Sequence, residues 1–263
     1  MSGTSVSHGG FPAARTAEDI ARNVAAVRAR IAAACMRVGR DPAEVRLLPV
    51  SKTVEEARIR MAYAAGLRSF GENKVQEARE KAEAMADLGI AWSVIGHLQT
   101  NKAKYVARFA AEFHALDSLK VAAALDRRLQ SDGRSLDIFV QIDSSGEASK
   151  YGLAPEDAPA FLRELPAFTA LMVRGLMTLA VFSADADRVR ACFRLMRNLR
   201  DRLREDAPDG VALSEISMGM SGDYEIAIEE GATVVRVGQA IFGARRLPDI
   251  HYWPSEAVQS GES

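Results

Sequence analysis

Short apolar runs alternate with longer amphipathic segments along most of this chain. The runs have the length of buried β-strands, and the segments repeat apolar residues at the spacing of one helical face. We expect eight strands, at residues 45–50, 68–70, 91–95, 112–115, 136–142, 171–176, 213–217 and 233–237. A helix is expected after each of them, at residues 54–65, 74–87, 101–108, 118–130, 155–165, 186–203, 222–230 and 239–242.

The regular alternation of strand and helix predicts the fold class. Strands separated by helices pair in parallel, and eight such units with short connections in 263 residues predict a (β/α)8 TIM barrel. The alternative is an open doubly wound sheet, but no G-x-G-x-x-G motif follows the first strand to support it.

An additional helix is predicted ahead of the first strand. Thr16 and Asp19 have the spacing of a helical capping box, and an apolar helical face follows them. The expected domain organisation is a disordered tail at residues 1–15, one barrel at residues 16–248 and a second tail at residues 249–263.

Composition and charge narrow the classes of function. The net charge is −1, so the chain lacks the basic field that would attract nucleic acid or an anionic membrane. Two cysteines and four scattered histidines offer no zinc-binding spacing. Residues 1–15 lack the apolar core of a signal peptide, and the longest apolar run, residues 167–182, is interrupted by Arg174. We expect a cytoplasmic monomer that binds neither nucleic acid, membrane nor metal.

Lys52 stands at the carboxyl end of the first predicted strand. Side chains alternate along a strand, so Lys52 shares one face with Arg46, Leu48 and Val50. Position alone leaves two interpretations open. The residue can be a surface lysine that ends a strand, or a desolvated amine whose pKa is lowered so that it forms a Schiff base with a carbonyl group. Active sites of TIM barrels lie at this end of the strands.

Two glycine-containing loops follow the last two predicted strands. The first runs from Ser217 to Asp223, and the second places Gly238 and Gln239 before a short helical segment. Backbone amides at helix N-termini attract anions, and the loops after strands seven and eight are the usual phosphate cradle of a TIM barrel. Each loop alone can be a helix cap and a tight turn, with Ser221 as the capping residue. Together they indicate a phosphate site.

Arg236 shares a strand face with Gly238, so both point to the barrel mouth if one does. A charged side chain inside a barrel needs a partner, which is either an inward carboxylate or an acceptor on a ligand. A Schiff-base lysine, a phosphate cradle and an inward arginine together describe a pyridoxal phosphate site. Arginine can only donate a hydrogen bond, so facing the ring nitrogen it leaves that atom unprotonated and weakens the ring as an electron sink.

Seven motifs carry a family resemblance. They are Leu-Pro-Val-Ser-Lys ending at Lys52, Phe-Gly-Glu-Asn ending at Asn73, Ile-Gly-His-Leu-Gln-Thr-Asn-Lys ending at Lys102, Ser-Lys-Tyr-Gly at 149–152, Arg-Gly-Leu-Met-Thr at 174–178, Ser-Met-Gly-Met-Ser at 217–221, and Val-Arg-Val-Gly-Gln-Ala-Ile-Phe-Gly ending at Gly243. With these motifs in order, residues from about 16 to 246 resemble the pyridoxal phosphate homeostasis proteins, which are single barrels similar to the N-terminal domain of alanine racemase.

The resemblance implies a role for each candidate residue. Lys52 would hold pyridoxal phosphate as a Schiff base, and Asn73 would flank the ring. Arg236 would face the ring nitrogen. The phosphate would be lined by Ser217, Gly238 and Gln239. Position 239 is often a small hydroxyl residue in the family, so glutamine puts its side-chain contact in doubt but leaves its backbone N–H. The motif residues Asn101 and Lys102 have no role that we can derive, and solvation of a helix start is the simplest one.

A cofactor carrier and a cofactor-dependent enzyme such as an amino-acid racemase are both compatible with this site. Racemisation needs an acid or base on each face of the cofactor, and in alanine racemase-like enzymes a second domain and a partner subunit complete the site. Here the barrel takes up nearly the whole chain, and His97 is the best candidate for a second base. A Schiff-base aldolase without cofactor would leave Arg236 unexplained. We therefore expect a protein without catalytic residues that buffers pyridoxal phosphate and delivers it to apo-enzymes.

Overall fold

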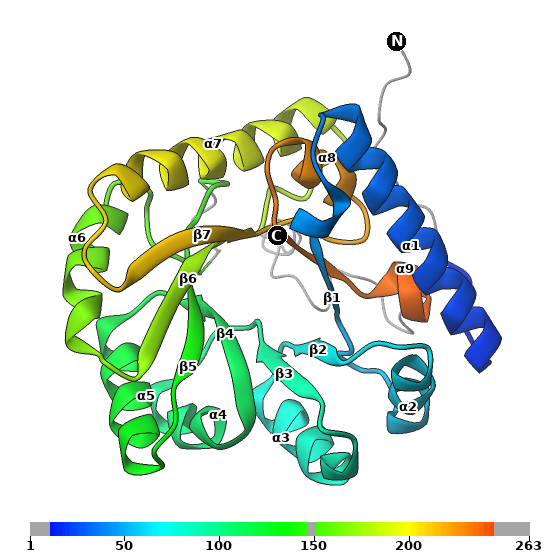
Figure 1. Ribbon diagram of the computed structural model, residues 1–263, viewed down its shortest axis with the longest axis horizontal. Helices are drawn as coiled ribbons and strands as arrows, with labels where there is room; N and C mark the ends of the chain where they lie inside the picture. The colour runs from blue at the N-terminus through cyan, green and yellow to red at the C-terminus, as the bar shows by residue number, and fades with distance from the viewer. Residues whose placement is uncertain (1–10, 147–150, 245–263) are drawn as a thin grey trace, which may run out of the picture.

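The computed structural model describes residues 11–146 and 151–244 of the chain. Its eight parallel strands form one ring in the order β1-β8-β7-β6-β5-β4-β3-β2 (Figure 1). A bridge between Val50 and Gly71 joins the first strand to the second. The strands are β1 (Arg46–Pro49), β2 (Ser69–Glu72), β3 (Ala91–Val94), β4 (Ala110–Leu116), β5 (Leu136–Gln141), β6 (Leu171–Met177), β7 (Val211–Ser217) and β8 (Val234–Val237). The predicted TIM barrel is thereby confirmed.

Helices cover the outside of the ring, as Figure 1 shows. They are α1 (Ala17–Arg37), α2 (Glu56–Ala64), α3 (Val75–Ala84), α4 (Ala103–Phe109), α5 (Leu119–Ser131), α6 (Ala158–Glu164), α7 (Ala186–Glu205), α8 (Tyr224–Glu229) and α9 (Gln239–Phe242). Four 3-10 turns lie at Pro42–Glu44, Ala86–Leu88, Thr100–Lys102 and Leu165–Ala167. The predicted capping box of Thr16 and Asp19 starts α1, which packs against α2, α8 and α9. Asn101 and Lys102, which we expected within a helix, form a 3-10 turn before it.

Residues 11–15, which we expected in the amino-terminal tail, lie against the end of the barrel domain. The backbone N–H of Ala244 donates to the carbonyl oxygen of Phe11 at 2.9 Å, and Ala14 is buried. The remainder of both expected tails lies outside the described residues. Among the described helices, none is long and apolar enough to cross a membrane. The described residues also contain no group of three or more His, Cys, Asp or Glu side chains placed to hold a metal ion.

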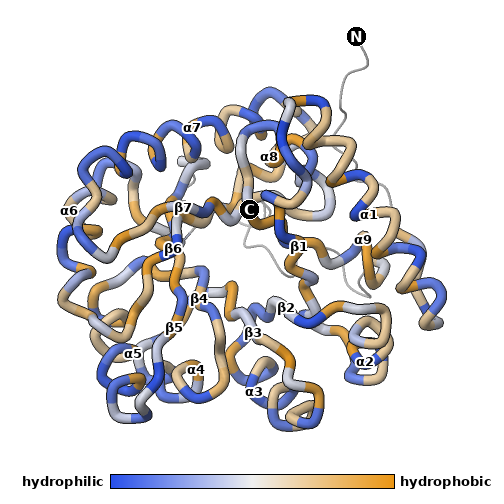
Figure 2. Tube along the Cα trace, viewed as in Figure 1, coloured by the Kyte–Doolittle hydropathy of each residue, from blue (hydrophilic) through white to orange (hydrophobic). Residues whose placement is uncertain are grey.

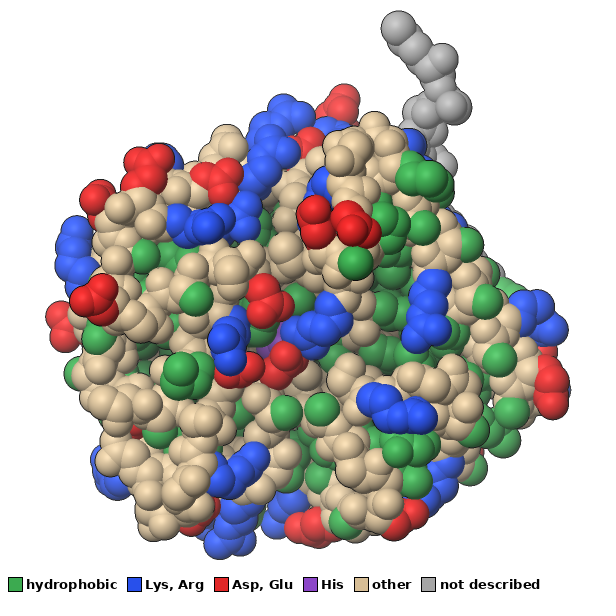
Figure 3. Space-filling model, viewed as in Figure 1, with side chains coloured by type: hydrophobic (Ala, Val, Ile, Leu, Met, Phe, Trp, Pro, Cys, Tyr) green, Lys and Arg blue, Asp and Glu red, His purple; other side chains and the backbone are tan. Residues whose placement is uncertain are grey.

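Apolar residues pack between the strands and the helices, whereas the barrel interior also contains charged and polar side chains. Hydrophobic residues follow the strands and the inner faces of the helices in Figure 2, whereas polar residues mark the outer helical faces. At the amino-terminal end of the interior, Arg46 Nη2 lies 2.8 Å from Glu112 Oε1 and 3.6 Å from Glu215 Oε2. Charged side chains of both signs gather at the centre of the face in Figure 3. This charge cluster fills one end of the barrel, and the strand ends that carry the predicted site lie at the other.

Candidate functional site

The carboxyl ends of the strands bring together residues from both halves of the sequence. Lys52 and Asn73 follow β1 and β2, Ser217 ends β7, and Gly238 and Gln239 follow β8. A Cβ atom on Gly238 would lie only 2.9 Å from the carbonyl oxygen of Val50, two residues before Lys52. Only glycine allows the loop after β8 to lie this close to the end of β1, which Lys52 follows.

Arg236 is a cation inside the barrel. It is 3% exposed and donates from Nη1 to Ser217 Oγ at 2.8 Å and from Nη2 to the carbonyl oxygen of Thr178 at 2.7 Å. Both partners are neutral, and no carboxylate among the described residues forms an ion pair with it. Burial lowers the pKa of Arg236 to about 10, against an opposing effect of Asp223, so the guanidinium is still charged at pH 7.

His114 on β4 forms a hydrogen bond with Ser217 inside the barrel. Its Nδ1 lies 3.0 Å from Ser217 Oγ, and its Nε2 lies 2.9 Å from Glu112 Oε2. Burial lowers the pKa of His114 despite the opposing effect of Glu112, which favours the neutral imidazole. Glu112 can only accept, so Nε2 carries the proton and Nδ1 accepts the hydroxyl proton of Ser217. The lone pairs of Ser217 are thereby left to accept from Arg236.

Ser217 is fully enclosed in the barrel. The residue is 0% exposed, and its hydroxyl group has Arg236 as a donor and His114 as an acceptor. Sequence patterns placed Ser217 at the right strand end but did not reveal His114, because its partner is 103 residues away.

The loops after β7 and β8 are joined by Ser221. Its Oγ accepts from the backbone N–H of Gly238 at 3.2 Å and from that of Ala240 at 3.3 Å. The backbone N–H groups of Gly238 and Ala240 therefore converge on one neutral hydroxyl between the two loops, at long distances. Converging amides at a helix start are donors suited to an anionic oxygen. Ser221, considered above as a helix cap, caps α9 from the neighbouring loop.

The strand ends next to Lys52 carry Asn73 and His97. A Cβ atom on Gly96 would collide with Asn73 at 2.2 Å from its carbonyl oxygen, so the loops after β2 and β3 are in direct contact. His97 stacks on Tyr151 at 4.0 Å between ring centroids, and its Nδ1 lies 3.6 Å from Asp117 Oδ2. Burial raises the pKa of Asp117 although His97 opposes this effect. His97 is thus held against neighbouring side chains of the mouth.

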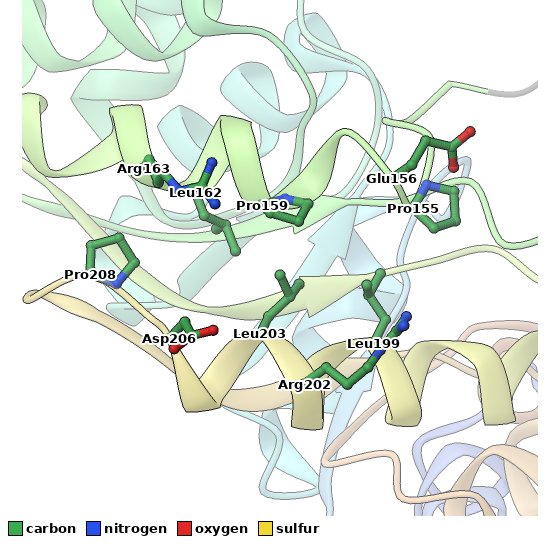
Figure 4. A pocket seen from close by; sticks show the side chains of 10 residues that line it. All are labelled: Pro155, Glu156, Pro159, Leu162, Arg163, Leu199, Arg202, Leu203, Asp206 and Pro208. Carbon is green, nitrogen blue, oxygen red and sulfur yellow. The ribbon is translucent and has the colours of Figure 1, made fainter.

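Two cavities lie away from these strand ends. A groove of about 460 Å³ separates α6 from α7, where Leu162 faces Leu199 and Leu203 (Figure 4). A second cavity, of about 510 Å³, lies at the amino-terminal end and is lined by Arg46 and Glu215 among others. Neither cavity contains a predicted site residue, so the candidate site rests on the geometry of the mouth.

Known proteins resemble this chain over most of its length. The family model for the N-terminal domain of alanine racemase matches residues 17–246. A pyridoxal phosphate homeostasis protein of Pseudomonas aeruginosa is 45% identical over 226 residues, which are 86% of this chain and 96% of the relative. PipY of Synechococcus elongatus, whose structure has PLP bound, is 37% identical with a TM-score of 0.75, over 85% of this chain and 100% of PipY.

A more distant likeness concerns the fold alone. Alanine racemase of Clostridium difficile is 15% identical with a TM-score of 0.68, over 92% of this chain and 60% of that one. The barrel and the family expected from the sequence motifs are both confirmed by these comparisons. The chain belongs to the family of pyridoxal phosphate homeostasis proteins, and its barrel has the fold of the alanine racemase N-terminal domain.

Proposed function

We propose that this protein binds pyridoxal 5'-phosphate at the barrel mouth, as a Schiff base on Lys52, and acts in intracellular pyridoxal phosphate homeostasis. It buffers the cofactor and delivers it to apo-enzymes as a cytoplasmic monomer, without turnover of its own. The relative of known structure that is 37% identical has PLP bound, and curated relatives are named for pyridoxal phosphate homeostasis.

The observation that carries the proposal is the buried, charged Arg236 with neutral protein partners. A charge removed from water needs compensation, and an acceptor at the mouth supplies it. Of the two partners considered for Arg236 from sequence, a carboxylate and a ligand acceptor, the surroundings favour the ligand. We assign the pyridine nitrogen as that acceptor.

The phosphate fits the donors at the start of α9. The N–H groups of Gly238 and Ala240 converge on Ser221 Oγ, and a phosphate oxygen is a stronger acceptor than that hydroxyl. The backbone N–H of Gln239 belongs to the same turn. Asn73 flanks the ring from the loop after β2, and Ser217 acts by holding Arg236.

The same arginine supports the proposed absence of turnover. When bound, pyridoxal phosphate supplies an electron sink for carbanions. Arg236 has no proton to give up at neutral pH and can only donate, so it keeps the ring nitrogen unprotonated and that sink weak. Release of the cofactor to acceptor proteins is compatible with this chemistry, whereas proton abstraction from an amino acid is not favoured by it.

Borohydride reduction of the loaded protein tests the attachment. The absorbance spectrum should change on reduction, and peptide mapping should find the pyridoxyl group on Lys52 and no label in Lys52→Ala. A label on Lys74 or Lys102 would refute the assignment.

Incubation with single-enantiomer alanine or serine in deuterated water tests the absence of turnover. Racemisation or α-proton exchange should stay at the rate of free pyridoxal phosphate. A faster, Lys52-dependent rate would favour the racemase-like alternative, with His97 and Asp117 as the first residues to replace.

A further inference from the structure

Both chain neighbours of Lys52 are held by side chains from outside the mouth. Ser51 Oγ donates to Glu72 Oε1 at 2.6 Å, and the carbonyl oxygen of Ser51 accepts from Lys81 Nζ at 2.7 Å. On the other side of Lys52, the backbone N–H of Thr53 donates to Glu77 Oε1 at 2.6 Å. Donors and acceptors on β2 and α3 thus fix the backbone immediately before and after Lys52.

The three holding side chains form one cluster behind β2. Lys81 Nζ lies 2.8 Å from Glu72 Oε1 and 2.7 Å from Glu77 Oε1. With the Ser51 carbonyl as its third acceptor, all three donors of the ammonium group are used. Lys81 is 6% exposed and Glu72 is 0% exposed. Such a buried network has a defined geometry, because any displaced member would leave a charge without compensation.

Thr53 adds a backbone conformation that requires outside support. Its φ angle is +64°, in the left-handed region that β-branched residues rarely adopt. Residues in this region persist when their surroundings hold them there. The hydrogen bond from Thr53 to Glu77 is such a restraint, and it acts one residue after Lys52.

These restraints act on both sides of Lys52 in the turn that follows β1. The Ser51 hydroxyl group faces Glu72 on β2, and the Ser51 carbonyl faces Lys81 on α3. Lys52 lies between this residue and Thr53, whose backbone N–H is held by Glu77. Fixing the Ser51 carbonyl and the Thr53 amide leaves the Cα–Cβ bond of Lys52 little freedom. A change of the turn would change the direction in which the Lys52 side chain leaves the backbone.

We infer that Lys81, Glu72 and Glu77 are positioning residues that aim Lys52 at the cofactor site. The inference rests on the proposed function in taking Lys52 as the cofactor lysine, and it goes beyond that function in assigning a task to a cluster that touches no cofactor. Anchoring of α3 to the barrel is the competing role. The two roles predict different results for variants of Glu77, which is at the edge of the cluster.

Glu77→Ala removes the acceptor for Thr53, and Glu77→Gln keeps an acceptor oxygen there. Glu83→Ala is the matched control, because Glu83 also lies on α3 and pairs with Arg79 at 3.7 Å. Equilibrium affinity for pyridoxal phosphate should fall about tenfold in Glu77→Ala, recover in Glu77→Gln and stay within about twofold in Glu83→Ala. The pH at which the visible band of the loaded protein changes should shift in Glu77→Ala only. Affinities and pH profiles that match the wild type in Glu77→Ala would overturn the inference, whatever the change in Tm.

A cofactor-free measurement separates this inference from the proposed function. Acetic anhydride is used to acylate the unloaded protein, and peptide mapping gives the ratio of acylation at Lys52 to that at the exposed Lys74. The ratio should rise at least about threefold in Glu77→Ala and in the double variant Glu72→Gln/Lys81→Met, which removes both buried charges together. An unchanged ratio in both variants refutes the positioning role. A raised ratio in a protein that takes up no pyridoxal phosphate at Lys52 would support positioning and refute the proposed function.

Discussion

Arg46 and Arg236 lie at opposite ends of the same barrel interior, and their electrostatic surroundings are opposite too. Arg46 meets the carboxylates of Glu112 and Glu215, so positive and negative charges are matched within the protein. Arg236 is more deeply buried, yet its protein partners are a hydroxyl group and a carbonyl oxygen. A charge paired with carboxylates indicates structure, and a buried charge whose hydrogen-bond partners are neutral indicates a place for a ligand. We therefore attribute a stabilising role to the amino-terminal end of the barrel and propose binding at the carboxyl-terminal end.

The free energy of unfolding at acid pH should show how much the charge cluster at the amino-terminal end of the barrel contributes to stability. Burial alone would raise the pKa of Glu112, but the hydrogen bond from His114 and the charges of His114 and Arg46 lower it to about 2 from 4.5. A depressed carboxyl pKa contributes stability above the unfolded pKa, and that contribution is lost as pH falls from about 4.5 towards 2. The contribution is about 3 kcal/mol. Urea unfolding at several pH values should show this loss in the wild type and a weaker dependence in Glu112→Gln.

His114 should make this loss of stability begin at a higher pH. Its folded pKa is lowered, so the unfolded chain takes up this proton first and stability begins to fall below about pH 6.5. A wild-type profile that is flat from pH 6.5 to 3 would contradict both assignments.

Replacing Arg236 should damage binding while sparing the fold. Arg236→Met removes one charge-assisted hydrogen bond, which lowers affinity for pyridoxal phosphate about thirtyfold. The change leaves Ser217 Oγ and the Thr178 carbonyl without this donor, but it also removes a buried charge that has no carboxylate ion pair, so the free energy of unfolding without cofactor should fall by less than about 1 kcal/mol. Equilibrium dialysis and urea unfolding measure the two quantities. A large loss of stability with unchanged affinity would mean that Arg236 stabilises the fold and does not bind the cofactor.

Replacing Arg46 should give the opposite pattern. Arg46→Met leaves Glu112 and Glu215 without their cation, which lowers the free energy of unfolding by about 2 kcal/mol. Affinity for pyridoxal phosphate should stay within about twofold of the wild type. A loss of affinity comparable with that of Arg236→Met would mean that the two ends do not act separately.

Ser217→Ala tests whether Ser217 affects cofactor retention through Arg236 or by its own contact. The change removes the hydroxyl group between Arg236 and His114, and retention of pyridoxal phosphate should fall about tenfold because Arg236 loses its support. The backbone amides at α9 preserve partial binding. If Ser217 acts through Arg236, Ser217→Ala should cost little further affinity in an Arg236→Met background. Fully additive losses would indicate a direct phosphate contact by the serine.

The amino-acid pattern was sufficient for the strands and for the order of the loops that follow them. It predicted Lys52 after the first strand and Arg236 in the last one, and the glycines after the last two strands marked the two loops. The sequence pattern could not identify the hydrogen-bond partners across the barrel. The alternation of side chains along a strand specifies which face of the sheet a residue is on, but not which residue it contacts. His114 and Ser217 meet across strands that are not adjacent, and register irregularities occur between β3 and β4, β4 and β5, β5 and β6, and β6 and β7.

The role of Ser221 was also beyond the sequence pattern. A serine at the start of a helix is read as the cap of that helix. Here its hydroxyl oxygen accepts hydrogen bonds from backbone N–H groups at the start of α9, which follows a different strand. The partner depends on how closely β7 and β8 bring their loops, and that distance is set by packing of the whole ring.

The closure of the ring between β1 and β2 has a consequence for hydrogen exchange. β1 pairs with β8 over four residues, but it meets β2 through the Val50–Gly71 bridge and the bond from the Ser51 amide to the Gly71 carbonyl. A seam with so few backbone bonds opens locally at a lower free energy than the longer pairings of β5 and β6. The Ser51 amide should therefore exchange with deuterium well before that of Phe139. Lys52 stands beside this weakly bonded seam of the barrel wall.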